Sequence, residues 1–211
     1  MSPRTLLLVL SAVVSCGVST AAAQTAPAGD RAAGGWFRPE ASVTIGLAVP
    51  TAQLFREVYG AALIPVALQV EVPLGDRGFL VFGGVRHVRR GGEAVVETTG
   101  AASGQDVRFR MTTARFGVGW RVARGAWMVA VAGGPAYSSL REEWEGLDLV
   151  TDDRALGIGA QASLSRAVSR RISLLLRTEY SWARSSPSQD DTLPAASLGA
   201  IDLAGGIAVR F

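Results

Sequence analysis

From residue 36 to residue 211, apolar residues alternate with polar or small residues along much of the chain. In the last segment, one set of alternate positions is apolar, and it comprises Ile201, Leu203, Ile207, Val209 and Phe211. A period of two places alternate side chains on opposite faces of a β-strand. The same pattern recurs along the chain and predicts eight strands, at 42–49, 64–72, 78–88, 116–122, 127–137, 156–164, 172–182 and 201–211. In 78–88 the composition indicates a strand, but the pattern does not show which face is apolar.

The connections between these strands alternate in length. Tight turns are predicted at 75–78, 123–125 and 167–170, and longer polar loops at 51–62, 89–106, 139–154 and 183–197. Short turns at one end and long loops at the other indicate an up-and-down meander. Because the strand series both starts and ends on the short-turn side, the number of strands is even. The expected fold class is all-β, an eight-stranded antiparallel up-and-down transmembrane β-barrel.

The membrane assignment depends on which face points outward. The face opposite the apolar one consists mostly of Ala, Gly and Ser, which suits a narrow barrel interior better than a solvated surface. Aromatic residues occur at two levels, with Phe79, Trp120, Trp127 and Phe211 near the short turns and Tyr137, Tyr180 and Trp182 near the long loops. Two such levels are typical of the girdles at the two faces of a bilayer. The alternative is a soluble periplasmic β-barrel that binds an apolar ligand.

The first 23 residues have the pattern of a cleaved signal peptide. Arg4 precedes a short apolar run, and Ala21–Ala23 fit the small-residue cleavage site. Residues 24–35 are expected to form a flexible leader, and 36–211 the barrel. The segment ending at Cys16 also resembles a lipoprotein processing box, in which Cys16 would be acylated. Cleavage after Ala23 instead would remove the only cysteine.

Composition narrows the function classes. The chain has 211 residues, with 48% hydrophobic and 18% charged residues and a formal net charge of +3. All 21 basic residues are Arg, and they are spread along the chain without the basic stripe that nucleic-acid binding requires. No nucleic-acid partner is therefore expected, and no cofactor motif is present.

The C-terminal segment carries a family resemblance. Gly206, Val209 and Phe211 match the terminal signal that the barrel-assembly machinery reads in the small outer-membrane β-barrel proteins of Gram-negative bacteria, although Ala204 replaces a preferred polar residue. Together with the export signal and the strand number, residues 36–211 resemble this porin-like family. The resemblance implies a monomer in the outer membrane, in contact with outer-membrane lipid and lipopolysaccharide, and the assembly machinery as a partner during biogenesis.

Charged residues on the small-residue face are candidates for an interior network. They are Glu71, Arg115, Arg121, Arg177, Glu179 and Asp202. Eight strands leave an interior that side chains can just fill, and buried charges need partners. These residues are expected to plug the barrel by pairing with one another. The alternative is a narrow Arg-lined pore for small solutes.

Two further groups of charges lie in predicted loops. The loop at 139–154 carries the acidic residues Glu142, Glu143, Glu145, Asp148, Asp152 and Asp153. They are expected to form a solvated acidic loop, with a divalent-cation or partner site as the alternative, although the D-x-D-x-D-G ligand spacing is absent. The pair Arg89–Arg90 is expected to be the charged base of a loop at the top of the third strand, with contact to lipid phosphates as the alternative.

An enzyme that modifies lipid A is the remaining alternative. His87 is the only histidine. Its candidate partners are the serines expected at the same level along the barrel axis, Ser138, Ser139 and Ser181. None of them stands in the spacing of the known deacylase pattern, so we expect no catalytic site. The predicted function is structural or surface interaction through the long extracellular loops.

Overall fold

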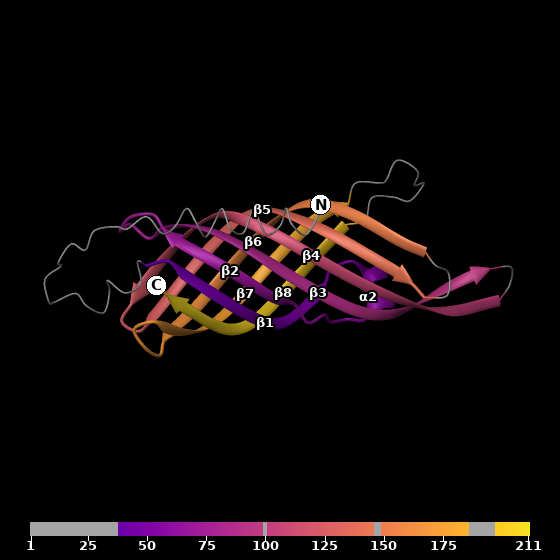
Figure 1. Cartoon of the computed structure of the whole chain (residues 1–211), viewed down its shortest axis with the longest axis horizontal. Coiled ribbons are helices and arrows are strands. Elements are labelled where there is room, and N and C mark those ends of the chain that lie inside the picture. Colours follow the sequence, from indigo (N-terminus) through magenta and orange to yellow (C-terminus); the bar gives the residue numbers. More distant parts are fainter. Residues whose placement is uncertain (1–37, 99–100, 146–148, 186–196) are drawn as a thin grey trace, which may run out of the picture. The chain divides into compact units, whose positions relative to one another are not determined.

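The segments with period two form eight strands that pair antiparallel in chain order. β8 pairs with β1, so the sheet closes into a barrel (Figure 1). The computed structural model describes residues 38–98, 101–145, 149–185 and 197–211. The strands are β1 (Glu40–Pro50), β2 (Val66–Pro73), β3 (Phe79–Thr98), β4 (Ala101–Arg124), β5 (Trp127–Trp144), β6 (Leu149–Ala167), β7 (Ile172–Ser185) and β8 (Ser197–Arg210). The predicted up-and-down barrel is confirmed.

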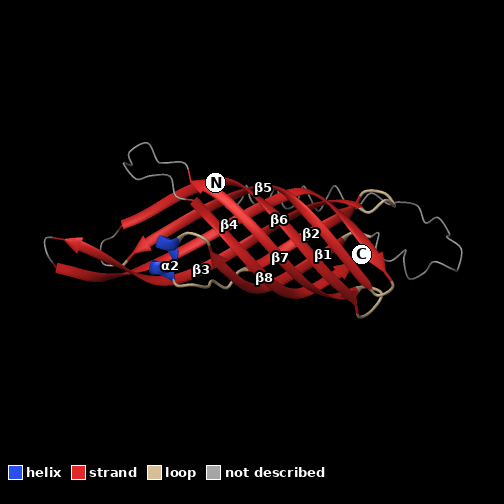
Figure 2. Ribbon diagram, turned by 180° about the vertical axis from the view of Figure 1, so that it is seen from behind, coloured by secondary structure: helices blue, strands red, loops and turns tan. Residues whose placement is uncertain are grey.

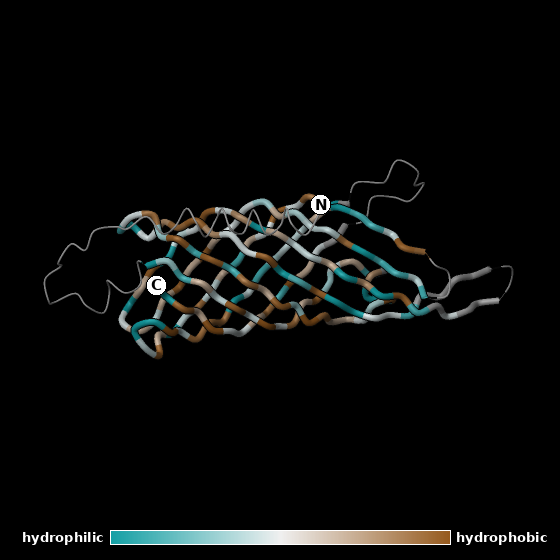
Figure 3. Tube along the Cα trace, in the orientation of Figure 1, coloured by the Kyte–Doolittle hydropathy of each residue, from teal (hydrophilic) through white to brown (hydrophobic). Residues whose placement is uncertain are grey.

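The apolar face of the barrel points outward. In β1, Val43 and Ile45 are 56% and 60% exposed, whereas the neighbouring Ser42 and Thr44 are only 4% and 3% exposed. The same alternation of hydrophobic and hydrophilic positions runs along the other strands (Figure 3), and large apolar side chains are exposed around the wall. An apolar exterior is the arrangement of a membrane barrel and the reverse of a soluble ligand-binding barrel.

Three tight connections form one end of the barrel, which we call the short-turn end. They join β2 to β3, β4 to β5 and β6 to β7. Gly125 occupies the two-residue turn between β4 and β5 with φ +61°, a left-handed conformation that favours glycine. The opposite end, from which the longer strands project, is called the hairpin end (Figure 2).

The predicted loops at 89–106 and 139–154 are wrong. β3 continues to Thr98 and β4 begins at Ala101, while β5 continues to Trp144 and β6 begins at Leu149. Beyond the apolar wall the alternation is reversed, because Val107 and Phe109 face the filled interior whereas Arg108 and Arg110 face outward. The charged outward positions resemble a polar loop, but the backbone ladder continues through them.

The connection between β1 and β2 contains a short helix that the sequence pattern does not predict. This helix, α2 (Gln53–Tyr59), is followed by Leu63, which forms an isolated bridge with Ala48. β2 therefore begins at Val66, two residues later than expected. None of the helices in the described part of the chain is long and apolar enough to cross a membrane.

The structure resolves the faces of β3. Leu80, Phe82, Arg86 and Val88 point into the barrel, because the even-numbered residues of this strand are the buried ones. The two faces are hard to distinguish in the sequence because apolar residues occur on both.

Candidate functional site in the barrel interior

All six residues of the predicted charge network lie inside the barrel. Each is at most 6% exposed, and they are Glu71, Arg115, Arg121, Arg177, Glu179 and Asp202. They come from β2, β4, β7 and β8, and the alternation of each strand directs them inward. The network occupies the central part and the short-turn end of the interior.

Two ion pairs connect β7 to its surroundings. Arg115 on β4 pairs with Glu179 across the barrel. Arg177 lies 3.7 Å from a Glu71 oxygen and donates a hydrogen bond of 3.2 Å to the Ser42 hydroxyl. Glu71 also accepts a hydrogen bond of 2.8 Å from the Gln69 side-chain amide. These contacts join β1, β2, β4 and β7 through the interior rather than through the sheet.

Asp202 pairs with Arg86, a residue that the sequence reasoning did not assign to the interior. The two Asp202 oxygens lie 2.8 and 3.0 Å from Arg86 Nη2. Arg86 was missed because the pattern of β3 left its inward face undecided. Counting charges would not have signalled Arg86, since the six predicted residues already comprise three arginines and three carboxylates.

A further pair closes the network near the short-turn end. Arg210 Nε lies 3.1 Å from a Glu40 oxygen, and Arg210 also contacts the Ser173 hydroxyl. Both charged residues are 3–4% exposed. Extending the period of two by one step from Ser42 places Glu40 on the inward face, so this pair was detectable in the sequence. Nearby, Arg121 donates a hydrogen bond of 3.3 Å to the Arg38 carbonyl.

The helix α2 lies within the hairpin end of the barrel. Tyr59 is 4% exposed and packs among the inward-facing residues Val88, Val107, Phe109 and Leu140. Its ring and that of Phe55 contact Phe109, with centroids 5.1 and 4.8 Å apart. This end of the interior is thus filled by an aromatic cluster rather than by ions.

Polar contacts fasten α2 to two strands. The Tyr59 hydroxyl donates a hydrogen bond of 2.6 Å to Glu142 on β5, and Arg90 on β3 donates one of 3.1 Å to the Tyr59 carbonyl. Burial and the adjacent carboxylate raise the pKa of the Tyr59 hydroxyl above its ordinary value, which keeps the donor protonated. Gly92 permits the close approach, because a Cβ there would overlap the Val58 carbonyl.

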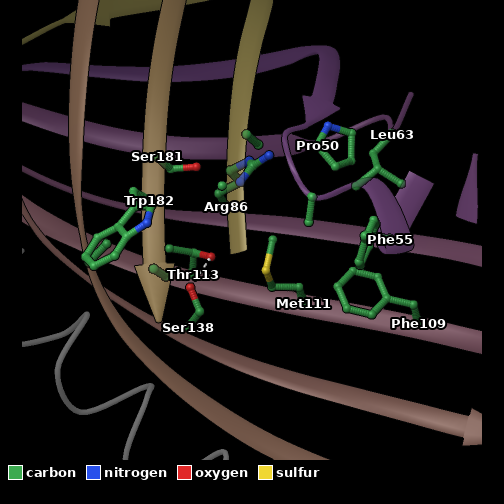
Figure 4. A pocket seen from close by; sticks show the side chains of 15 residues that line it. Pro50, Phe55, Leu63, Arg86, Phe109, Met111, Thr113, Ser138, Ser181 and Trp182 are labelled. Carbon is green, nitrogen blue, oxygen red and sulfur yellow. Dashed lines mark hydrogen bonds between the residues drawn. The ribbon is translucent and has the colours of Figure 1, made fainter. Parts of the chain in front are cut away.

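A cavity of about 40 Å³ separates the aromatic cluster from the ion pairs. Its walls are apolar near α2, where Pro50, Phe55, Leu63 and Phe109 lie, and more polar toward Arg86 (Figure 4). On that side Thr113 and Ser138 share a hydrogen bond of 2.9 Å. A second cavity, of about 10 Å³, lies beside Asp202 and Arg177. These volumes correspond to a few water molecules and to about one.

His87 does not meet its candidate catalytic partners. It points outward, where its Nδ1 lies 3.0 Å from the Thr112 hydroxyl, whereas Ser138 is buried on the inward face. Ser181 lines the interior cavity, and Ser139 is separated from His87 by the whole of β4. The barrel wall therefore prevents His87 from acting with Ser138 or Ser181.

The residues of the predicted acidic loop lie mainly on a hairpin. Glu142 and Glu143 belong to β5, and Asp152 and Asp153 to β6, while Glu145 is in the turn and Asp148 lies outside the described residues. Several of these carboxylates pair with arginines, including Glu145 with Arg108 at 2.6 Å. A solvated acidic loop is thus replaced by a strand hairpin with cross-strand ion pairs.

The residues Arg89 and Arg90 do not act as a pair. Arg90 points inward to α2, whereas Arg89 is exposed on the outward face of β3. Adjacent residues of a strand face opposite sides, so extension of β3 through this segment separates them.

The C-terminal residues lie in and after β8. Val209 and Phe211 are 39% and 70% exposed on the outward face, and Gly206 packs against the backbone of Val43 on β1. Recognition of these three residues by the assembly machinery stays a prediction.

Comparisons with known proteins identify the fold. No protein-family model and no curated protein sequence matches the chain. Among solved structures, Neisserial surface protein A is similar with a TM-score of 0.53 and 11% identity, over 82% of this chain and 97% of that one. A major outer membrane protein from Thermus thermophilus gives 0.51 and 13%, over 81% and 99%. OprG of Pseudomonas aeruginosa gives 0.51 and 8%, over 82% and 96%. The chain has the fold of the small outer-membrane β-barrels.

Proposed function

We propose that this chain is an integral outer-membrane β-barrel protein with a closed interior, which acts in envelope structure or surface interaction through its projecting hairpins. The observation that carries the proposal is the reversal of the usual burial pattern. Large apolar side chains are exposed around the wall, while the buried residues include a network of charges. Only a lipid environment makes such an exterior favourable.

The height of the apolar wall supports membrane insertion. On β4 the outward residues from Val122 to Ala114 span eight residue steps, or about 27 Å along the strand. Strands in such barrels tilt by roughly 40°, which reduces this to about 20 Å of height, near the ~25 Å apolar band of outer-membrane barrels. Phe116 and Val118, within this span, are 64% and 66% exposed.

The filling of the interior supports a closed barrel rather than a pore. Ion pairs occupy its centre, α2 occupies its hairpin end, and the two interior cavities described above measure about 40 and 10 Å³. Conduction would require the guanidinium and carboxylate groups to separate. A rigid closed scaffold leaves the projecting hairpins as the surface available to partners.

The orientation follows from the lengths of the connections. Outer-membrane barrels have short periplasmic turns and longer extracellular segments. In the proposed orientation the hairpin end lies on the extracellular side. The β3–β4 and β5–β6 hairpins of the monomer project there beyond the bilayer. Gly206, Val209 and Phe211 would be read by the barrel-assembly machinery from the periplasmic side.

Refolding and conductance of residues 24–211, the expected mature chain, test the proposal. We expect the refolded chain to migrate differently on gels before and after boiling, and to give no current steps once inserted in a planar bilayer. Reproducible small steps would overturn the closed interior in favour of a narrow pore. Failure to insert in any bilayer would overturn the membrane assignment.

A charge in the apolar wall provides a sharper test of insertion. Val118→Arg is expected to destabilise the inserted barrel by about 2–4 kcal/mol, because lipid solvates a guanidinium poorly near the midplane. Val168→Arg is the matched control, since Val168 is equally exposed (65%) but lies in a short turn. The measurement is urea unfolding in vesicles. Equal destabilisation by both substitutions would contradict the assignment of the wall to lipid.

A further inference from the structure

Three arginines form a row across the outer face of β3, β4 and β5. Arg89 lies opposite Arg110, and Arg110 lies opposite Arg141. All three belong to the outward faces of their strands, and the side chains of Arg110 and Arg141 are 41% and 49% exposed. Like charges directly opposite one another destabilise a sheet. The row therefore favours an anionic partner.

The position of the row relative to the apolar wall indicates the kind of anion. The last apolar row on this side contains Val85, Ala114, Tyr137 and Leu156, which are successive cross-strand partners. The next row contains His87, Thr112, Ser139 and Arg154, and the arginine row follows. Successive rows on one face lie about 6.7 Å apart along the strand. The guanidinium groups thus lie just beyond the boundary between apolar and polar surface.

The carboxylates nearby neutralise the row only in part. Glu143 is shared, with its oxygens 3.5 Å from Arg110 Nη2 and 3.0 Å from Arg141 Nε. Asp152 lies 3.8 Å from Arg141. Among the described residues, the buried Nε of Arg110 has no hydrogen-bond partner. With Arg154 in the adjacent row, four arginines face two carboxylates.

We propose that the row of Arg89, Arg110 and Arg141 binds the phosphate group of an outer-leaflet lipid. This inference rests on the membrane-spanning barrel proposed above. Guanidinium groups bind phosphate through paired, charge-assisted hydrogen bonds, and Thr112 and Ser139 add hydroxyl groups below. A lipid whose chains lie against Val85 and Tyr137 would hold its phosphate at the level of the row.

The short-turn end offers a contrast. There the guanidinium of Arg166 lies over the ring of Trp127, 5.3 Å from its centroid. That arginine is engaged by an aromatic residue of the wall. Arg166, together with Arg124 and Arg170 at the same end, provides a control in which three positive charges are removed far from the row.

The test is lipid retention by the whole barrel. Wild type, the triple variant Arg89→Gln/Arg110→Gln/Arg141→Gln and the control Arg124→Gln/Arg166→Gln/Arg170→Gln are inserted into phosphatidylcholine nanodiscs that contain lipid A. After transfer to detergent, native mass spectrometry counts the lipid A that each protein retains. We expect wild type and control to retain lipid A. The row variant should retain about tenfold less. Fully dephosphorylated lipid A should be retained weakly by all three.

A second variant keeps the test independent of any loss of stability. Glu143→Gln removes the carboxylate that competes for Arg110 and Arg141, so retention of lipid A should rise above wild type. Heat-dependent migration on gels establishes that each variant is folded. Unchanged or lower retention by folded Glu143→Gln would overturn the proposal.

The remaining outcomes distinguish the proposed membrane barrel from the proposed phosphate site. If wild type does not insert into the nanodiscs, the proposed membrane function is wrong. If all proteins insert and the row variant retains as much lipid A as wild type, the phosphate site alone is wrong. Displacement of lipid A by millimolar inorganic phosphate would indicate a site for free phosphate and overturn the assignment to lipid.

Discussion

The two ends of the barrel interior are filled by different chemistry. From the centre to the short-turn end the interior holds ion pairs: Arg115–Glu179 joins β4 to β7, and Glu40–Arg210 joins the adjacent strands β1 and β8. At the hairpin end, a helix inserts Tyr59 and Phe55 against Phe109. The ion pairs belong to the barrel itself, whereas the aromatic cluster depends on a connecting segment.

This difference predicts that substitutions in the two regions have different effects on stability. A buried charge that loses its partner cannot be solvated, so its removal lowers the unfolding free energy of the whole barrel. The segment carrying α2 can instead leave the interior while the backbone ladder of the barrel remains paired. We therefore expect substitutions in the ion-pair region to lower global stability and substitutions at α2 to open the hairpin end locally.

The largest effect is expected from Arg115→Met. It leaves the Glu179 carboxylate buried without its cation and should destabilise the barrel by about 3–5 kcal/mol. The measurement is the free energy of unfolding in vesicles, from urea titration followed by tryptophan fluorescence. The double variant Arg115→Met/Glu179→Leu is the control and should lose much less, since no charge is left unpaired. Equal losses in the two variants would mean that the pair does not hold the interior together.

A smaller and local effect is expected from Gly92→Val. Its side chain would overlap the Val58 carbonyl and displace α2, at a cost of about 2 kcal/mol. Cleavage by trypsin after Arg56, which is exposed on α2, should then accelerate roughly thirtyfold while the global unfolding midpoint stays unchanged. Gly91→Val is the matched control, because a Cβ at Gly91 meets nothing within 4 Å. If both variants are cleaved equally fast, α2 is not held against β3.

The smallest effect is expected from Tyr59→Phe. The substitution keeps the ring but removes the hydrogen bond to Glu142, a loss of about 1 kcal/mol or roughly a fivefold faster cleavage after Arg56. Tyr180→Phe, on the exposed outer wall, controls for loss of a hydroxyl. Cleavage at the wild-type rate would show that packing alone retains α2.

Prediction from sequence succeeded where one face of a strand is apolar and the other is not. The phase of β1, β4 and β7 follows directly from alternation, and it places Arg115, Arg177 and Glu179 inside. The same rule would have placed Glu40 inside if the first strand had been extended by one step. It could not place Arg86, because Leu80 and Phe82 make the inward face of β3 as apolar as the outward face.

The sequence by itself determined the eight-stranded barrel, mainly through the alternation of apolar with polar or small residues. The small size of the residues on the other face, together with the two aromatic levels, indicated that the apolar face points outward. Tertiary structure alone decided which charges meet: Arg86 and Asp202 are 116 positions apart and come together only through closure of the barrel. It also decided that α2 enters the hairpin end and that Arg89, Arg110 and Arg141 align. Such pairings depend on the register between strands, which a pattern within one strand does not contain.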